Sequence, residues 1–149
     1  MEYDIKILNG LIATTIDSVN GYREAMEEAD GQHFRSIFAD RANEREAVVT
    51  ELRARVRALG GNPEDDGTLV AGAHRMFMNL KDSLTGSDDT AIIAEVERGE
   101  DHIKAKYETA LADQDLAPDT AAVVRSAFTS VKAGHDQMRD LKHGVSASY

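Results

Sequence analysis

The stretch NPEDDGTLVAGAHRMFMNLKDSLTG, residues 62–86, decides the fold of this 149-residue chain. It is about 25 residues long, whereas a plain turn between neighbouring antiparallel helices needs roughly 2 to 8. Its apolar residues recur at helical spacing, which predicts a short helix over about residues 68–84. A helix of that length spans roughly 25 Å and can run back along much of a bundle. The long segments before and after it are therefore expected to point in the same direction.

Four long amphipathic helices are predicted around this connection, because their apolar residues recur at i, i+3, i+4 and i+7 spacing. The second ends at Gly60-Gly61, as the C-terminus of a helix often does. The fourth begins at Pro118, which the first turn of a helix tolerates. The predicted bounds are about residues 4–29, 32–59, 88–112 and 118–143, with residues 144–149 fraying at the end.

Two antiparallel hairpins joined by one long crossover make the ferritin-like arrangement of a four-helix bundle. Hydrophobic residues make up 42% of the chain and charged residues 30%, which is typical of a globular protein. The length fits one domain over residues 1–149. The sequence therefore predicts an all-α, ferritin-like domain with a short fifth helix in its crossover.

Charge and composition exclude several classes of function. The chain has 17 Lys and Arg against 27 Asp and Glu, a net charge of −10, so no nucleic-acid or membrane partner is expected. The absence of cysteine excludes thiol nucleophiles and Cys-ligated metals. The sequence has neither a signal peptide nor a membrane span, which predicts a soluble cytoplasmic protein. Nucleotide-binding and hydrolase motifs are also missing, and this favours a non-enzymatic role.

Two arginines, Arg41 and Arg45, lie near the middle of the apolar stripe of the second helix. A buried arginine without a partner is very costly. Because Glu100 lies within the stripe of the third helix, we expect Arg41 or Arg45 to pair with it inside the bundle. The other members expected in this core polar network are His135 and the hydroxyl of Tyr22 or Tyr107.

The two hairpins echo each other in sequence. Residues 22–25 read YREA and residues 107–110 read YETA, while residues 35–38 read RSIF and residues 125–128 read RSAF. If these echoes mark a repeat, they relate the first helix to the third and the second helix to the fourth. That relation is the internal twofold symmetry of ferritin-like bundles.

A metal site is the alternative to a structural polar network. Ferritin-like di-metal proteins use one Glu on each of two helices and Glu-x-x-His on each of the other two. In the register of the hairpin repeat, only Glu100 and His135 occupy such positions, and Arg45 stands at a third. No di-iron centre or other cofactor is therefore expected. A single iron, manganese or zinc ion could still find ligands in one set of side chains: Glu44, Glu97, Glu100 and His135.

Several short motifs are spread over nearly the whole chain: Gly21–Ala25, Arg41–Arg45, Leu59–Pro63, Val70–Gly72, His74-Arg75, Leu80–Leu84, Glu97–Asp101 and His135-Asp136. Together they resemble the uncharacterised ferritin-like four-helix-bundle proteins of bacteria. The resemblance implies the ferritin-like fold and, through related proteins, a link with bacterial stress responses. It implies no reaction, and the chain departs from ferritins and rubrerythrins at the metal-ligand positions.

We therefore expect a non-enzymatic bundle that acts through a homo-oligomer or a protein partner, with the core polar network in a structural role. The competing hypothesis is a metal-binding protein or di-metal carboxylate oxidoreductase with a degenerate ferritin-like site. Arg41 and Arg45 distinguish the two, because a cation facing the centre favours an ion pair, whereas one turned outward leaves room for metal. A small-ligand pocket between helices is neither supported nor refuted by the sequence.

Overall fold

The computed structural model describes residues 2–64 and 89–148, with side chains as far as residue 144. These residues form four helices: α1 (Glu2–Glu28), α2 (Gln32–Ala58), α5 (Asp89–Ala112) and α6 (Pro118–Ser148). Within these ranges there is no strand, and no helix has an apolar run sufficient to cross a bilayer. The predicted all-α four-helix bundle is confirmed. The predicted crossover helix, residues 68–84, lies outside the described residues.

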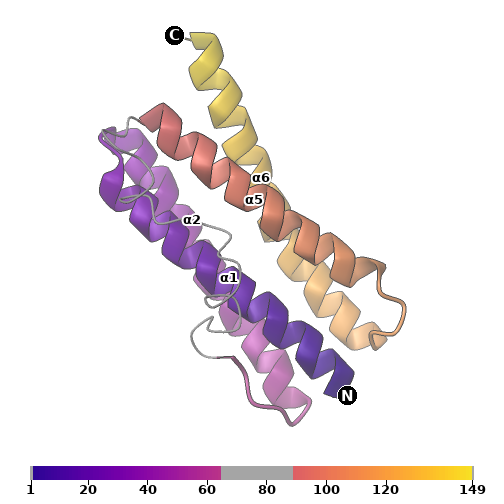
Figure 1. Ribbon diagram of the computed structural model, residues 1–149. Coiled ribbons are helices and arrows are strands. Elements are labelled where there is room, and N and C mark those ends of the chain that lie inside the picture. Colours follow the sequence, from indigo (N-terminus) through magenta and orange to yellow (C-terminus); the bar gives the residue numbers. More distant parts are fainter. Residues whose placement is uncertain (1, 65–88, 149) are drawn as a thin grey trace.

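The helices pack as two antiparallel hairpins, α1 with α2 and α5 with α6 (Figure 1). The hairpins meet through α1 against α5 and α2 against α6, so α2 and α5 face each other across a diagonal of the bundle. As expected from the long crossover, α2 and α5 run in the same direction (Figure 1). The last turns of α6 project beyond the other three helices (Figure 1).

The helices end within two residues of their predicted bounds, with one exception. The fourth helix was predicted to end near residue 143, whereas α6 continues through Gly144 to Ser148. Gly60 is the one described glycine with a positive φ, 83°, so Gly144 keeps an ordinary helical conformation. Gly60 at the end of α2 does turn into the left-handed region, a conformation in which glycine commonly ends a helix.

The turn between α1 and α2 is held by the first residue of α5. Gly31 precedes α2 and has no side chain to cap the helix. The carboxylate of Asp89 instead accepts hydrogen bonds from the backbone N–H groups of Asp30 and Gly31, each at 2.8 Å. A carboxylate beside a helix N-terminus is also favoured by the helix dipole. The two hairpins are thereby tied together at this end of the bundle.

The apolar core is divided into two clusters along the bundle axis. One cluster contains Leu8, Leu52 and Ile103, and the other contains Phe38 and Ile92. On each helix a polar or small residue lies in sequence between the members of the two clusters: Ser18 on α1, Arg45 on α2, Glu100 on α5 and Gly134 on α6. We call these four residues the central layer.

The sequence echo between the hairpins has a counterpart in the packing. In the first hairpin the rings of Tyr22 and Phe38 lie with their centroids 6.3 Å apart. In the second hairpin the rings of Tyr107 and Phe128 lie 6.4 Å apart. The aromatic residues that the two echoed motifs align therefore form a similar pair in each hairpin.

Candidate functional site

The central layer contains a fully buried ion pair across the diagonal of the bundle. Arg45 on α2 and Glu100 on α5 are both 0% exposed. The guanidinium donates two parallel hydrogen bonds to the carboxylate, Nη1 to Oε1 at 2.8 Å and Nη2 to Oε2 at 2.6 Å. It also donates to Ser18 Oγ at 2.7 Å and to the carbonyl oxygen of Val131 at 3.3 Å. All four helices therefore contribute to one hydrogen-bonded group.

The environment keeps the Arg45 guanidinium charged. Burial alone would lower the pKa of the Arg45 guanidinium, but the adjacent Glu100 carboxylate raises it above its ordinary value. The ring of Tyr22 packs against the cation, with its centroid 5.5 Å from Arg45 Cζ, close enough for a cation–π interaction. Burial, followed by the negative charge of Glu100, raises the pKa of the Tyr22 hydroxyl well above its ordinary value. Tyr22 therefore stays neutral beside the ion pair.

Gly134 lets α6 close over the ion pair. A Cβ atom at this position would lie 2.4 Å from Arg45 Nη2 and 3.0 Å from Glu100 Oε2. Sequence reasoning missed this residue. A glycine in the interior of a helix costs roughly 1 kcal/mol relative to alanine, so its position in the predicted fourth helix was a signal for close packing.

Tyr107, the second tyrosine expected near the network, bonds elsewhere. Its hydroxyl lies 2.8 Å from Thr15 Oγ1, which itself donates to the carbonyl oxygen of Leu11 at 2.6 Å. Burial raises the pKa of Tyr107 to about 12, although the hydrogen bond to Thr15 acts in the opposite direction. Tyr22 is thus the tyrosine that contacts the ion pair, and Tyr107 belongs to a separate buried contact between α1 and α5.

Arg41 and Glu44 lie at the seam between α2 and α6, outside the buried ion pair. Arg41 Nε donates to Gln137 at 2.7 Å, and its Nη1 lies 3.0 Å from Glu44. The Glu44 side chain is 44% exposed and accepts a further hydrogen bond from Ser130. Of the two arginines expected to pair with Glu100, the structure places Arg45 there.

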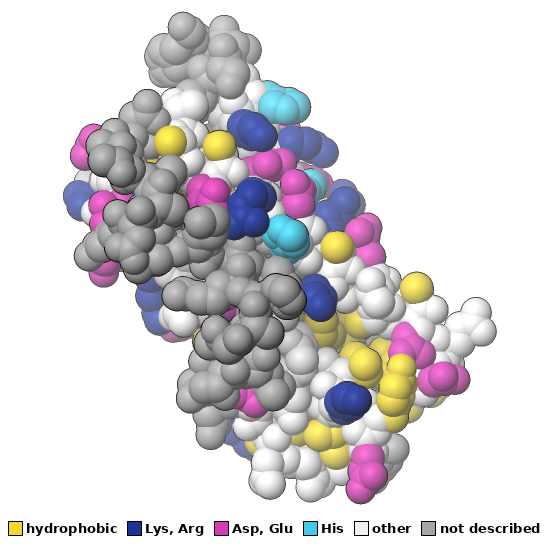
Figure 2. Space-filling view, viewed as in Figure 1, with side chains coloured by type: hydrophobic (Ala, Val, Ile, Leu, Met, Phe, Trp, Pro, Cys, Tyr) yellow, Lys and Arg dark blue, Asp and Glu magenta, His cyan; other side chains and the backbone are white. Residues whose placement is uncertain are grey.

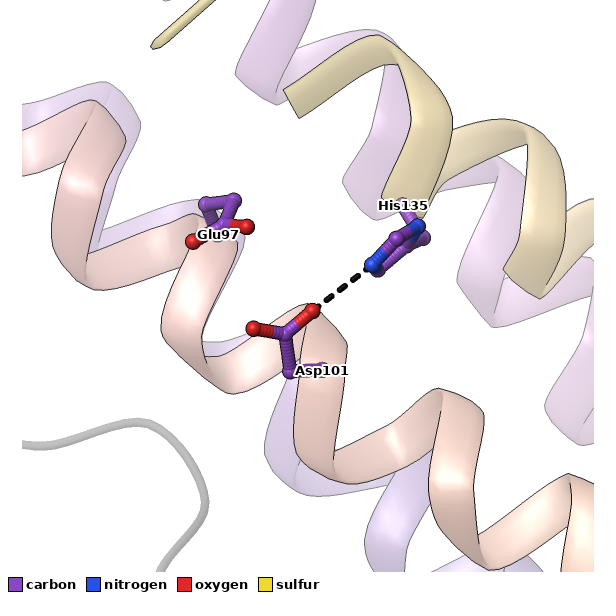
Figure 3. A group of neighbouring side chains, drawn as sticks. All are labelled: Glu97, Asp101 and His135. Carbon is purple, nitrogen blue, oxygen red and sulfur yellow. Dashed lines mark hydrogen bonds and ion pairs between the residues drawn. The ribbon is translucent and has the colours of Figure 1, made fainter. Parts of the chain in front are cut away.

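The four residues predicted as ligands for a single ion do not converge. Glu100 is bound to Arg45 in the interior, and Glu44 is bound to Arg41. Glu97 and His135 do come together, at the seam between α5 and α6, and Asp101 is the third member of their group (Figure 3). Sequence reasoning missed Asp101 because it lies outside the apolar stripe, although its spacing of four residues from Glu97 was a signal.

Glu97, Asp101 and His135, which we call the surface group, are held by hydrogen bonds to one another and to their neighbours. His135 Nε2 lies 2.7 Å from Asp101 Oδ1, and His135 Nδ1 lies 3.2 Å from Asp136 Oδ1. Hydrogen bonds from Lys132 and then His135 lower the pKa of Asp136 to about 2. Figure 2 shows one face of the molecule. Acidic, basic and histidine side chains are intermixed at the end of that face nearest the C-terminus of α6, and hydrophobic side chains gather near its other end.

Comparisons with known proteins agree on the architecture. The model of a family described as a domain of unknown function (DUF2383) matches residues 4–113. A dodecameric thioferritin, the bacterioferritin-related protein from Bacteroides fragilis, superposes with a TM-score of 0.83 at 14% identity, covering 99% of this chain and 88% of its own. Dps from Staphylococcus aureus superposes with a TM-score of 0.75 at 20% identity, covering 95% and 96%. Such identities show the fold alone, and it is the predicted ferritin-like bundle. No curated protein matches the sequence.

Proposed function

Because this chain belongs to the family described as a domain of unknown function (DUF2383), we propose its function from its geometry: a non-enzymatic ferritin-like bundle that acts by self-association. A protein partner in place of a second copy is the alternative. The proposal includes a role in bacterial stress responses, which rests on the resemblance of the sequence motifs to stress-associated ferritin-like proteins. The Arg45–Glu100 pair has a structural role in this proposal.

The observation that carries the proposal is the guanidinium of Arg45 at the centre of the bundle. Ferritin-like di-metal proteins hold two ions between the helices with four carboxylates and two histidines. Glu100 is the one buried carboxylate of the central layer, and both of its oxygens are bound to Arg45. A guanidinium repels divalent ions, and Gly134 leaves no space beside it. The residues of the central layer therefore do not fit a dinuclear metal centre.

Two observations support association as the mode of action. The thioferritin from Bacteroides fragilis, which shares this fold over nearly the whole chain, is described as a dodecamer. Because the Arg45–Glu100 pair fills the interior of the bundle, we expect the function to depend on the outer faces of the helices. The net charge of −10 makes electrostatic repulsion between copies dependent on salt.

Self-association is tested by native mass spectrometry and sedimentation velocity over a wide range of protein concentration, at low and at moderate salt. We expect species at multiples of the 16.3 kDa chain mass, with larger species favoured at the higher salt because repulsion is screened. A mass of 16.3 kDa under every condition would contradict self-association.

The structural role of the ion pair is tested by the aerobic oxidation of Fe²⁺. We expect the wild-type protein to oxidise iron at the rate of buffer alone. Acceleration that is lost in Glu100→Gln but kept in the double variant Glu97→Gln/Asp101→Asn would overturn the proposal. Loss in the double variant alone would also contradict a non-enzymatic role, and it would assign the oxidation to Glu97, Asp101 and His135.

A further inference from the structure

The seam between α5 and α6 brings together three side chains that can bind a metal ion. Glu97 and Asp101 lie one helical turn apart on α5, and His135 faces them from α6 (Figure 3). One ligand atom from each residue lies within 4.8 Å of the other two. We propose that these residues bind one divalent transition-metal ion, with Zn²⁺ as the ion that fits them best.

His135 is already oriented for such a role. Its Nδ1 atom lies 3.2 Å from the carboxylate of Asp136, and its Nε2 atom faces Asp101 at 2.7 Å. Metal-binding histidines usually have one ring nitrogen held by a carboxylate or carbonyl so that the other points at the metal. Asp136 is in turn held by Lys132 Nζ at 2.9 Å. The carboxylate that orients the ring is thus itself fixed.

The donor set selects the class of ion. One imidazole nitrogen and two carboxylate oxygens suit Zn²⁺, Fe²⁺ and Mn²⁺, whereas Ca²⁺ and Mg²⁺ need more oxygen ligands. Zn²⁺ accepts three protein ligands with water in the fourth position. The His135 side chain is 10% exposed and that of Asp101 is 56% exposed, so the group is anchored on one side and open to water on the other.

Small movements are enough to admit the ion. Zinc bonds of about 2.1 Å place tetrahedral ligand atoms roughly 3.4 Å apart, so the contact between His135 and Asp101 has to open by less than about 1 Å. Asp101 is exposed and can change rotamer. Lys142 Nζ lies 3.4 Å from Glu97 Oε2, and because its side chain is 44% exposed it can move into solvent. Lys142 therefore competes with the ion for Glu97.

The test is calorimetric titration of the tag-free full chain with Zn²⁺. We expect one ion per chain, and binding weakened at least tenfold both in His135→Ala and in the double variant Glu97→Gln/Asp101→Asn. The matched control is His102→Ala, an exposed histidine next to Asp101, which should bind as the wild type does. Lys142→Ala should bind Zn²⁺ several-fold more tightly than the wild type, because Lys142 no longer competes for Glu97. No such gain is expected if the contact between Lys142 and Glu97 only stabilises the fold. Melting temperatures in a chelator verify that each variant is folded.

Three results would overturn the site: no binding to the folded wild type, equal affinity in His135→Ala, or Mg²⁺ binding as tight as Zn²⁺. Anaerobic Fe²⁺ and Mn²⁺ are further arms, and we expect both to bind more weakly than Zn²⁺. The inference does not depend on self-association, because titration and mass measurement are made separately and each can fail alone.

Discussion

At the scale of single residues, we expect the stability of the fold to depend strongly on the buried carboxylate of Glu100. Glu100→Ala leaves the Arg45 guanidinium in the interior without its partner, so the free energy of unfolding should fall by about 3 to 5 kcal/mol. Urea denaturation measures this change. Glu44→Ala, which removes an exposed carboxylate from an arginine on α2, should cost less than about 1 kcal/mol. A loss below about 1 kcal/mol for Glu100→Ala would contradict the structural importance of the pair.

Replacing Gly134 by alanine should destabilise the protein, although alanine has the higher helix propensity. Gly134→Ala brings a methyl group against Arg45 and Glu100, so we expect clear destabilisation in thermal and urea unfolding. Gly10→Ala is the matched control, because Gly10 also lies inside a helix and a Cβ there meets nothing within 4 Å. That control should gain about 0.5 to 1 kcal/mol. Equal effects of the two substitutions would rule out close packing at Gly134.

The hydroxyls of Tyr22 and Tyr107 should ionise only at a pH above the ordinary pKa of tyrosine. Burial raises the pKa of Tyr107 from 10.0 to about 12 and raises that of Tyr22 as well. Because the folded state favours the neutral hydroxyl, its stabilising contribution is complete below pH 10 and is lost as the pH rises towards 12. Tyrosinate absorbance followed together with circular dichroism should show these two residues ionising as the protein unfolds. Ionisation of all tyrosines near pH 10 with the fold intact would exclude the buried positions.

The sequence could predict Glu100 and an arginine partner because charged residues interrupt apolar stripes that must be buried. It could not choose between Arg41 and Arg45, since the two lie four residues apart on one helix face. The choice depends on how far α2 is rotated towards α5, which only the packing of all four helices determines. Asp101 lies outside the stripe, so a search for core-facing ligands passes over it.

At the scale of elements, α5 stabilises the start of α2. Asp89→Ala removes the carboxylate that accepts from Asp30 and Gly31, so it should lower the free energy of unfolding by about 0.5 to 2 kcal/mol. Asp40→Ala removes the same charge from an exposed position on α2 and should have little effect. Hydrogen exchange should show the loss of protection concentrated in the α1–α2 turn. Uniform loss over the bundle would contradict a local role.

The helices themselves were predictable because each has a continuous apolar stripe and a recognisable beginning or end. Gly60 ends α2 as its sequence position indicated, with the N–H of Gly61 bonded to the carbonyl oxygen of Val56 at 3.0 Å. Gly144 has the same residue type but no such conformation, and α6 passes through it. Residue type alone does not report the backbone conformation that ends a helix.

At the scale of the whole molecule, we expect the two charged residues of the central layer to be replaceable by apolar ones. Burying two charges costs desolvation energy that the ion pair does not fully recover, so Arg45→Met combined with Glu100→Leu should fold with equal or greater stability. Urea denaturation of the double variant beside Glu100→Ala measures the difference. Unfolding of the double variant as severe as that of Glu100→Ala would show that the layer is indispensable for stability itself.

The position of the ion pair across the diagonal also constrains how the two hairpins dock. Each hairpin can form its own helix contacts early, but Arg45 and Glu100 belong to different hairpins and meet only when these dock. A docking error of one helical turn, about 5.4 Å, leaves both charges buried and unpaired. The Arg45–Glu100 pair therefore favours the one alignment of the two hairpins in which its charges meet.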